Sequence, residues 1–378
     1  MKIYTKSILP LGFKASGISS GIKKSGKLDL ALFFSETPAT AACVFTANSI
    51  KAAPVILSKG YLRSNYYFQA IIANSGNANC FTGRQGLKDA QLTSKFLADA
   101  LGLKEKEVLV ASTGIIAKKL PVDKIKLGIP GLIKQLSREG INQAEKAIMT
   151  TDTFTKKISV KFSLGPKTVT ICGIAKGAGM IAPNMATLLS FIFTDAKITR
   201  QALNQALKVS VRNSFNCITV DGCMSTNDAV MLLANGAAQN ALVSGGKNLD
   251  LFIRVLSLVC LELAKMVVKD AEGASKFIRI KVSSAKNYNQ AKAAALSIAN
   301  SNLVKTAIYG QNPNFGRIAA AIGASGAGVE EKDLKIKVSS LKKKEIEIEV
   351  ELNQGKANAV IYTSDLTPEY VKINAEYN

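Results

Sequence analysis

Short apolar runs separated by small or polar turn residues dominate the first third of the chain. Runs of this kind are typical of strands, and they predict strands at 28–34, 41–48, 70–79 and 107–114. Between the last two, apolar residues recur at the spacing of an amphipathic helix, which predicts a helix over 86–102. A proline-punctuated stretch, 121–130, is expected to be a connection.

The remainder of the chain contains both strand-like and helix-like patterns of apolar residues. Two strands joined by a Gly-Pro turn are predicted in 158–175, and a third strand is expected to begin near 187. Further helices are predicted over 199–215, 225–238, 249–270, 286–300 and 314–324, with short strands at 216–223, 277–283 and 305–310. The alternating segments at 334–340, 344–353 and 356–366 are typical of an antiparallel sheet with one solvated face. Because strands and helices interleave in both halves, we predict an α/β (mixed α+β) protein.

Length and composition fit a folded globular protein. The chain has 378 residues, 47% hydrophobic and 20% charged, which predicts two domains or one domain with two lobes. The most apolar helical segment, 249–268, contains Asp250, Arg254, Glu262 and Lys265, so it is expected to be a core helix and no membrane partner is predicted. Because the N-terminus shows no secretion signal, we expect a cytoplasmic protein.

The absence of histidine excludes several classes of catalytic and metal site. No Ser-His-Asp triad, Cys-His dyad or histidine zinc motif can exist in this chain, so a general base must be a carboxylate, a lysine, a tyrosine or an α-amino group. The six cysteines form no C-x-x-C pair, which predicts free thiols in a reducing compartment. We therefore expect no metal and no cofactor.

The net charge of +22 raises the question of an anionic partner. A basic surface can attract nucleic acid or small anions. The lysines are dispersed, however, aromatic residues make up only 6% of the chain, and no nucleic-acid-binding motif is present. No nucleic-acid partner is predicted.

Two small-residue stretches can carry chemistry. In "ASTG", 111–114, a Thr-Gly pair at a predicted strand end can direct one hydroxyl and one backbone N–H at a single oxygen, as an oxyanion hole requires. In "KGAGMIAPNMATLLSFIFTDA", 176–196, Thr187 stands between a glycine-containing loop and an apolar run. A lone threonine is most often only a strand residue.

Thr187 can also be a reagent. Its hydroxyl could attack the carbonyl of Ala186, and hydrolysis of the resulting ester would expose a new α-amine. Such an amine has a pKa of about 8 and can act as the base for the hydroxyl of its own residue. This chemistry needs no histidine.

Six motifs in order resemble those of one known family: "ASTGIIA", "MTTDTFTKK", the 176–196 segment, "VDGCMSTNDAV", "NPNFGRIAAAIG" and "DLTPEYVKINAEY". They closely resemble the glutamate N-acetyltransferase / ornithine acetyltransferase family of arginine biosynthesis, over essentially the whole chain. Each motif is weak alone, but six in one order are highly specific.

The resemblance implies a self-cleaving enzyme with a layered, two-lobed fold. Cleavage between Ala186 and Thr187 would give an α chain, 1–186, and a β chain, 187–378, assembled as two of each. Thr187 would be the nucleophile that carries the acetyl group, and Thr113 and Gly114 would form the oxyanion hole.

The same resemblance implies the substrates and their contacts. Acetyl would pass from N2-acetylornithine to glutamate in a ping-pong cycle, and whether acetyl-CoA is a second donor stays open. The implied substrate contacts are Thr150 or its neighbour Thr151, Lys176, Thr187, Glu272 and Asn374. Lys176 could pair with a substrate carboxylate and Glu272 with an ammonium group.

Two other functions remain as alternatives at this stage. An N-terminal-nucleophile amidase or aminopeptidase would use the same cleavage and the same Thr187, but water would accept the acyl group. A basic binding protein without catalysis would stay uncleaved and bind nucleic acid with a steep dependence on salt.

Overall fold

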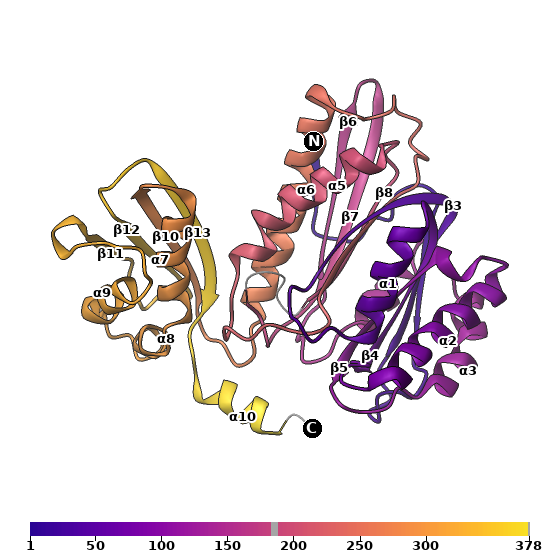
Figure 1. Ribbon diagram of the computed structural model, residues 1–378, viewed down its shortest axis with the longest axis horizontal. Coiled ribbons are helices and arrows are strands. Elements are labelled where there is room, and N and C mark those ends of the chain that lie inside the picture. The colour runs from indigo at the N-terminus through magenta and orange to yellow at the C-terminus, as the bar shows by residue number, and fades with distance from the viewer. Residues whose placement is uncertain (183–187, 377–378) are drawn as a thin grey trace.

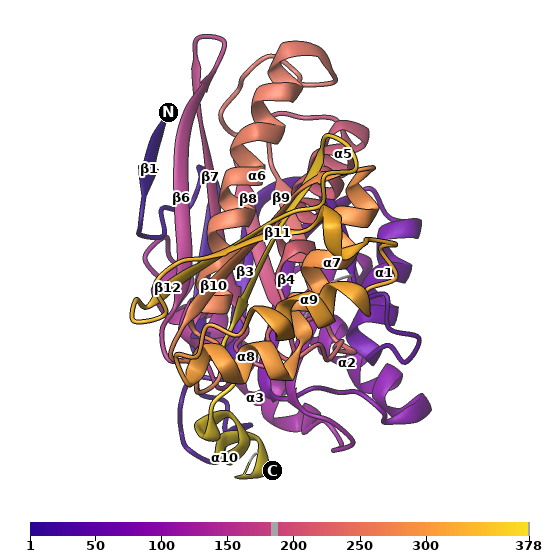
Figure 2. The ribbon, with the colours of Figure 1, turned by 90° about the vertical axis from the view of Figure 1, so that its left-hand side faces the viewer.

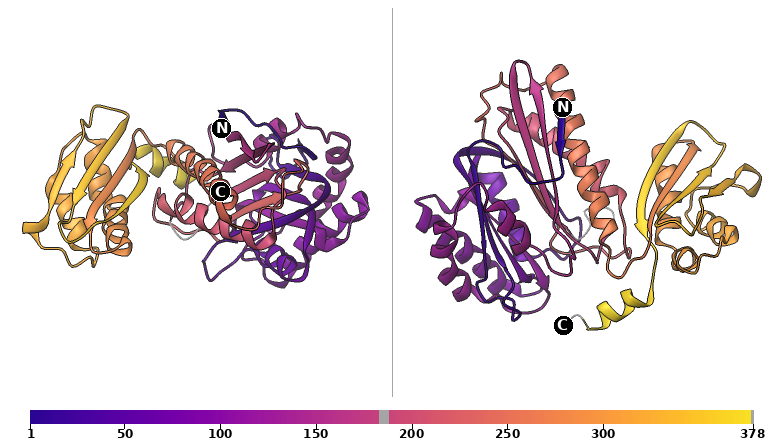
Figure 3. Two further views of the ribbon diagram at one scale, coloured as in Figure 1. Left: turned by 90° about the horizontal axis from the view of Figure 1, so that it is seen from above. Right: turned by 180° about the vertical axis from the view of Figure 1, so that it is seen from behind.

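The computed structural model describes residues 1–182 and 188–376, which form two lobes (Figure 1). The larger lobe is built on a nine-stranded sheet and the smaller lobe on a four-stranded sheet. Helix α10 (Pro368–Glu376) follows the smaller lobe and extends back beneath the larger one (Figures 1 and 3). The predicted mixed α/β class and layered, two-lobed fold are confirmed.

The large sheet is mainly antiparallel, with parallel pairs at β8–β9 and β4–β5. Its strands lie in the order β1 (Lys2–Tyr4), β6 (Lys156–Leu164), β7 (Lys167–Lys176), β8 (Leu189–Thr194), β9 (Ala229–Ala234), β3 (Leu30–Phe45), β4 (Tyr67–Asn77) and β5 (Val108–Ile115), and β2 (Phe13–Ile18) pairs with β3. The C-terminal ends of β5 and β7 carry the predicted residues Thr113 and Lys176.

Helices bury both faces of this sheet. In β8, Phe191 and Phe193 belong to one hydrophobic core, whereas Ile192 between them belongs to a second. The first core includes α1 (Ala53–Ser64), α2 (Gly83–Leu101), α3 (Val122–Lys134) and α4 (Ile141–Ala147), and the second includes α5 (Arg200–Arg212) and α6 (Gly246–Lys269). Burial on both faces explains why every residue of β8 and β9 is buried and why β9 is apolar at all its positions rather than alternating.

The smaller lobe packs three helices on one face of its sheet (Figure 2). The strand order is β11 (Lys335–Val338), β12 (Glu345–Glu351), β10 (Phe277–Ala285), β13 (Ala357–Ser364), and the helices are α7 (Tyr288–Asn300), α8 (Asn302–Tyr309) and α9 (Phe315–Gly323). In β12 the isoleucines and valine are buried and the glutamates alternate with them, so one face is solvated as predicted.

The antiparallel pairing expected for these segments is found at β11–β12 and β10–β13, but β10 and β12 are parallel. The chain leaves β10 through three helices and β11 before it enters β12 in the same direction. Parallel neighbours require such a crossover connection.

Helix α6 lies on the side of the larger lobe that faces the smaller lobe (Figures 1 and 3). Near its C-terminus, the Lys265 ammonium lies 5.7 Å from the ring centre of Tyr362, and that of Lys269 lies 5.2 Å from the ring centre of Phe277. Lys269 also forms an ion pair of 2.7 Å with Glu345. The predicted core helix therefore also contacts the second lobe.

Several predicted elements differ in the structure. The strands expected at 28–34 and 41–48 are one strand, β3, whose pairing with β4 shifts register between Phe34 and Ala39. The connection expected at 121–130 is the first part of α3. Pro121 precedes the helix, where it is tolerated, and three buried side chains, Ile125, Ile129 and Leu132, hold the helix in place despite Pro130 within it.

Three further predictions are wrong in the second half. The helix expected over 225–238 contains strand β9, because an apolar run buried on both faces carries no periodicity that separates strand from helix. The strand expected at 216–223 is a 3-10 turn followed by loop, with a single bridge between Ile218 and Tyr362. The strand expected at 305–310 belongs to α8, whose N-cap Ser301 accepts a hydrogen bond from Val304 N.

All six cysteines are free. Within 1–182 and 188–376, no helix is long and apolar enough to span a membrane. The same ranges contain no group of three or more Cys, Asp or Glu side chains arranged to hold a metal ion.

Close contact between β7 and α6 depends on Gly173. A Cβ atom there would lie 2.7 Å from Cγ1 of Val259 and 2.9 Å from Cδ1 of Leu263. We expect Gly173→Val to lower the free energy of unfolding by about 1–3 kcal/mol, because it overpacks this contact. Gly60→Ala in α1 is the control: no atom lies within 4 Å of its added Cβ, so urea unfolding should show equal or greater stability. Equal stability of both variants would contradict this account of the contact.

Candidate active site

The residues predicted for the site lie around one small pocket of about 100 Å³. Thr113, Gly114, Thr150, Thr151, Lys176, Glu272 and Asn374 all line it. They come from the end of β5, the loop between α4 and β6, the end of β7, the turn after α6, and α10. Ala186 and Thr187, also predicted for the site, lie outside the described residues.

The Thr113–Gly114 turn is built by close packing of two strand ends. Gly114 pairs with Gly76 of β4 and has a φ of +131°, a conformation that favours glycine. A Cβ on Gly114 would lie 2.4 Å from the carbonyl carbon of Gly76. Only glycine fits here, and Thr113 beside it is buried at the pocket.

Lys176 is a buried cation facing this turn. Its side chain is 3% exposed, and Nζ donates a hydrogen bond of 3.4 Å to Oγ1 of Thr113. Burial lowers the pKa of Lys176, and the carboxylate of Asp152 opposes that decrease. Within the described part of the chain, Lys176 forms no ion pair within 4 Å, so its ammonium can bind a ligand carboxylate.

Glu272 also lines the pocket, and its carboxylate lies against a glycine. Its backbone N–H donates to the carbonyl of Ala178 at 3.0 Å. A Cβ on Gly179 would lie 2.2 Å from Oε2 of Glu272. The glycines before the predicted cleavage point therefore allow a carboxylate to lie directly against the backbone.

Asn374 reaches Glu272 from α10. Its Nδ2 donates to Oε2 of Glu272 at 2.9 Å. Gly273, with φ +65°, lets the helix approach, because a Cβ there would lie 2.5 Å from the backbone nitrogen of Tyr370. The C-terminal helix thus supplies a side chain that orients the carboxylate.

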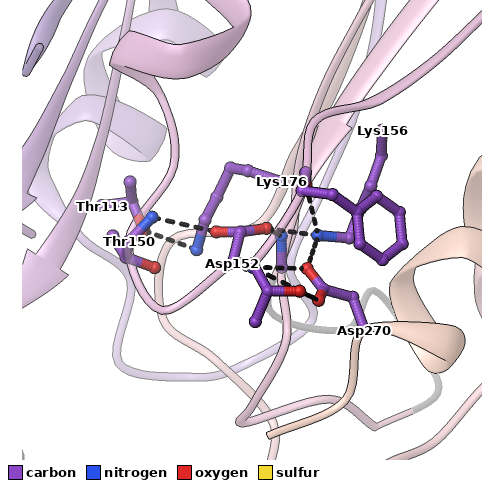
Figure 4. Close-up of polar contacts among 9 residues, drawn as sticks. Thr113, Thr150, Asp152, Lys156, Lys176 and Asp270 are labelled. Atoms are coloured by element: carbon purple, nitrogen blue, oxygen red, sulfur yellow. Dashed lines mark hydrogen bonds and ion pairs between the residues drawn. The ribbon is translucent and has the colours of Figure 1, made fainter.

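Thr150 and Thr151 both line the pocket. Either residue can therefore be the substrate contact that the resemblance assigns to one of the two. The loop is held by Asp152, whose Oδ2 accepts a hydrogen bond of 2.9 Å from Thr150 N. Figure 4 shows Asp152 next to Lys156, Asp270 and Lys176.

Some lining residues were missed by the sequence analysis. Ser225, Thr226 and Asn227 lie in the segment that was predicted to be helical. Asn227 Nδ2 donates to the carbonyls of Ala78 at 2.6 Å and Ser112 at 2.8 Å, which ties this segment to the strand ends. Its position in a polar cluster just before an apolar run was the available signal.

Asp221 was also missed. Its carboxylate accepts hydrogen bonds from the backbone N–H of Met180 at 2.6 Å and of Ile181 at 3.0 Å. The hydroxyl of Tyr370 donates to the same carboxylate at 3.2 Å. Asp221 therefore joins the loop after Lys176 to the C-terminal helix.

Asp228 is a buried carboxyl group next to the undescribed segment. Its Oδ1 accepts a hydrogen bond of 2.9 Å from Leu188 N. Oδ2 has no hydrogen-bond partner among the described residues. Burial raises the pKa of Asp228 well above its ordinary value.

Comparison with known proteins identifies the family. The model of the ArgJ family matches residues 14–378. The arginine biosynthesis bifunctional protein ArgJ 1 of Clostridium acetobutylicum is 47% identical, over 97% of this chain and 95% of its own length. The arginine biosynthesis bifunctional protein ArgJ of Geobacter sulfurreducens is 45% identical, over 97% of this chain and 98% of its own length.

A solved ornithine acetyltransferase from Mycobacterium tuberculosis, complexed with ornithine, is 38% identical; the match covers 50% of this chain and 98% of that one, with a TM-score of 0.45. On the family match, this chain belongs to the ArgJ family. The predicted family is confirmed, and with it the predicted enzyme class, an acyltransferase of arginine biosynthesis.

Proposed function

We propose that the protein transfers acetyl from N2-acetylornithine to glutamate through an acetyl group carried on Thr187. The observation that carries this proposal is the single pocket lined by Thr113, Gly114, Lys176, Glu272 and Asn374. It combines donors for an oxyanion with one buried cation, which matches the α-carboxylate of both substrates, and one carboxylate, which matches the side-chain ammonium of N2-acetylornithine.

The nucleophile would be produced by self-cleavage. The Thr187 hydroxyl attacks the carbonyl carbon of Ala186, the peptide C–N bond breaks, and the α-amine of Thr187 takes up the proton. Water then hydrolyses the ester and leaves the Ala186 carboxylate. The products are an α chain, 1–186, and a β chain, 187–378, which we propose assemble as two of each.

Each half of the transfer cycle is an acyl transfer. The Thr187 amine accepts the hydroxyl proton as the hydroxyl attacks the acetyl carbonyl, and Thr113 and Gly114 stabilise the oxyanion. The C–N bond to ornithine breaks and the proton moves to the leaving amine. The amine of glutamate then attacks the acetyl-threonine ester and restores the hydroxyl.

Charge explains how one pocket would accept both substrates. Acetylornithine and glutamate share an α-carboxylate, which the ammonium group of Lys176 would bind. Ornithine ends in an ammonium group that Glu272 would bind, held in place by Asn374. Glutamate ends in a carboxylate and gains nothing from Glu272.

The proposal is tested by supplying the substrates separately. With N2-acetylornithine alone, we expect intact-mass measurement to show one acetyl group on the β chain and only a burst of ornithine. Adding glutamate should remove the acetyl group and give steady turnover. Steady release of acetate without glutamate, at the same rate, would identify the N-terminal-nucleophile amidase instead.

Glu272→Gln should separate the two substrates kinetically. We expect KM for N2-acetylornithine to rise roughly ten- to a hundredfold, since a hydrogen bond to a charged group contributes about 1.5–3 kcal/mol. KM for glutamate should stay unchanged or fall. Glu262→Gln on α6 is the control, because Glu262 does not line the pocket and forms an ion pair of 2.8 Å with Lys265 on the same helix. An equal rise in both KM values would contradict the assigned role.

A further inference from the structure

A buried network of charges joins segments that line the pocket (Figure 4). Nζ of Lys156 lies 2.6 Å from Oδ1 of Asp152 and 2.5 Å from Oδ2 of Asp270. The side chains of Lys156 and Asp152 are 0% exposed and that of Asp270 is 2% exposed. Charges removed from water to this degree persist only when they are paired and hydrogen-bonded.

Asp152 is the branching point of this network. Besides Lys156, its carboxylate accepts hydrogen bonds from Gly177 N at 2.7 Å and from Thr150 N at 2.9 Å. Gly177 follows Lys176 directly in the chain. One carboxylate therefore fixes the backbone of two segments that line the pocket.

Asp270 extends the network to a third segment. It accepts hydrogen bonds from Thr153 N, at 3.0 Å to Oδ2, and from the Thr153 hydroxyl. Asp270 follows the last residue of α6 and stands two residues before Glu272. The loop after α4, the end of β7 and the turn after α6 are thus joined through Lys156.

We propose that Asp152 is a positioning residue, which aims Lys176 at the substrate carboxylate and balances its charge while Lys156 and Asp270 hold Asp152 in place. This inference rests on the proposed function, in which Lys176 binds that carboxylate. Asp152 itself is not among the residues that line the pocket. The sequence analysis did not identify Asp152, Lys156 or Asp270.

The electrostatic balance at Lys176 makes this role measurable. Asp152, Glu272 and Asp228 favour its charged form, whereas Lys156 disfavours it. Lys23 also acts on this site, since Lys176 and Lys23 repel each other. The carboxyl of Asp152 responds in turn: burial raises its pKa, but Lys176 and Lys156 outweigh burial and hold the pKa well below its ordinary range.

Asp152→Asn should shift the pH profile of kcat/KM for glutamate. Lys176 binds a carboxylate only when protonated, so activity falls as pH rises through its pKa. Burial lowers that pKa and Asp152 raises it. Without the Asp152 charge the pKa falls further, and we expect the alkaline limb to move to lower pH by roughly one unit or more.

Three matched variants separate this role from simple structural support. Lys156→Met removes a repelling charge, so its alkaline limb should move to higher pH. Asp270→Asn changes the same buried cluster, but Asp270 is not among the main charges acting on Lys176, so its limb should stay in place. Asp152→Glu keeps the charge and should retain the wild-type limb with a higher KM.

The outcomes distinguish this inference from the proposed function. Absence of acetyl transfer in the wild-type enzyme would refute the proposed function itself. Normal transfer, with the alkaline limb unmoved in folded Asp152→Asn and Lys156→Met, would overturn the positioning role. If Asp152→Asn does not fold, judged by its far-UV circular dichroism, the direction of the shift in Lys156→Met decides, and a limb that stays or moves to lower pH refutes the role.

Discussion

Thr187→Ala should leave the protein as a single chain with the full mass of 40.1 kDa and without measurable acetyl transfer. Alanine lacks the hydroxyl that would attack the Ala186 carbonyl and later carry the acetyl group. Because the α-amine that replaces histidine as the base is released by the same cleavage, one substitution removes both nucleophile and base. Loss of a catalytic nucleophile costs on the order of 10⁴-fold or more in rate.

Intact-mass measurement on freshly purified and long-incubated protein checks this result. Wild-type protein should separate into two chains after denaturation. Thr187→Ser keeps a hydroxyl and should cleave. Thr199→Ala is the control, since Thr199 caps α5 through Ala202 N and its loss should cost about 1 kcal/mol of stability without preventing cleavage. Cleavage of Thr187→Ala at the same bond would refute self-processing by this residue.

The parts of the fold predicted from sequence are those with a clear period or a strong end signal. Strand β12 alternates glutamate with isoleucine or valine, and only one of its faces is buried. Strand β9, by contrast, is apolar at all six positions because helices cover both faces of the sheet. Its sequence alone contains no alternation, so tertiary burial decided its conformation.

The site residues that lie in a recognisable sequence motif could be predicted. Those whose role depends only on a contact in the folded structure could not. Thr113 and Lys176 stand at strand ends, where short loops build sites. Asp152 is held by Lys156, and the second carboxylate bound to Lys156, that of Asp270, is more than a hundred residues away in the chain. Nothing local in the sequence distinguishes a buried pair of this kind from two solvated charges.

The C-terminal helix shows how the second lobe contributes to the site. Helix α10 follows β13 of the smaller lobe, yet Asn374 and Tyr370 bond to Glu272 and Asp221 beside the pocket. Gly273 allows this approach, since any Cβ would collide with the Tyr370 backbone. The recognition of the ornithine end would thus depend on how the two lobes meet.

Thr113→Val should lower kcat by roughly 10²–10³-fold and leave KM nearly unchanged, as expected for a lost oxyanion donor. Valine preserves the shape of threonine but removes the hydroxyl. Lys176 Nζ donates to Oγ1 of Thr113 at 3.4 Å, so the hydroxyl's own proton is available for an oxyanion. That interaction strengthens only as negative charge develops on the acetyl oxygen. Its loss therefore lowers kcat and leaves KM nearly unchanged.

Initial rates with saturating N2-acetylornithine and glutamate measure the effect. Thr113→Ser keeps the hydroxyl and should recover most of the rate. Ser112→Ala is the neighbouring control: its hydroxyl donates to Oδ1 of Asn74 at 2.6 Å and does not line the pocket, so kcat should hardly change. A rise in KM with kcat unchanged would instead assign Thr113 to substrate binding and leave the oxyanion without its side-chain donor.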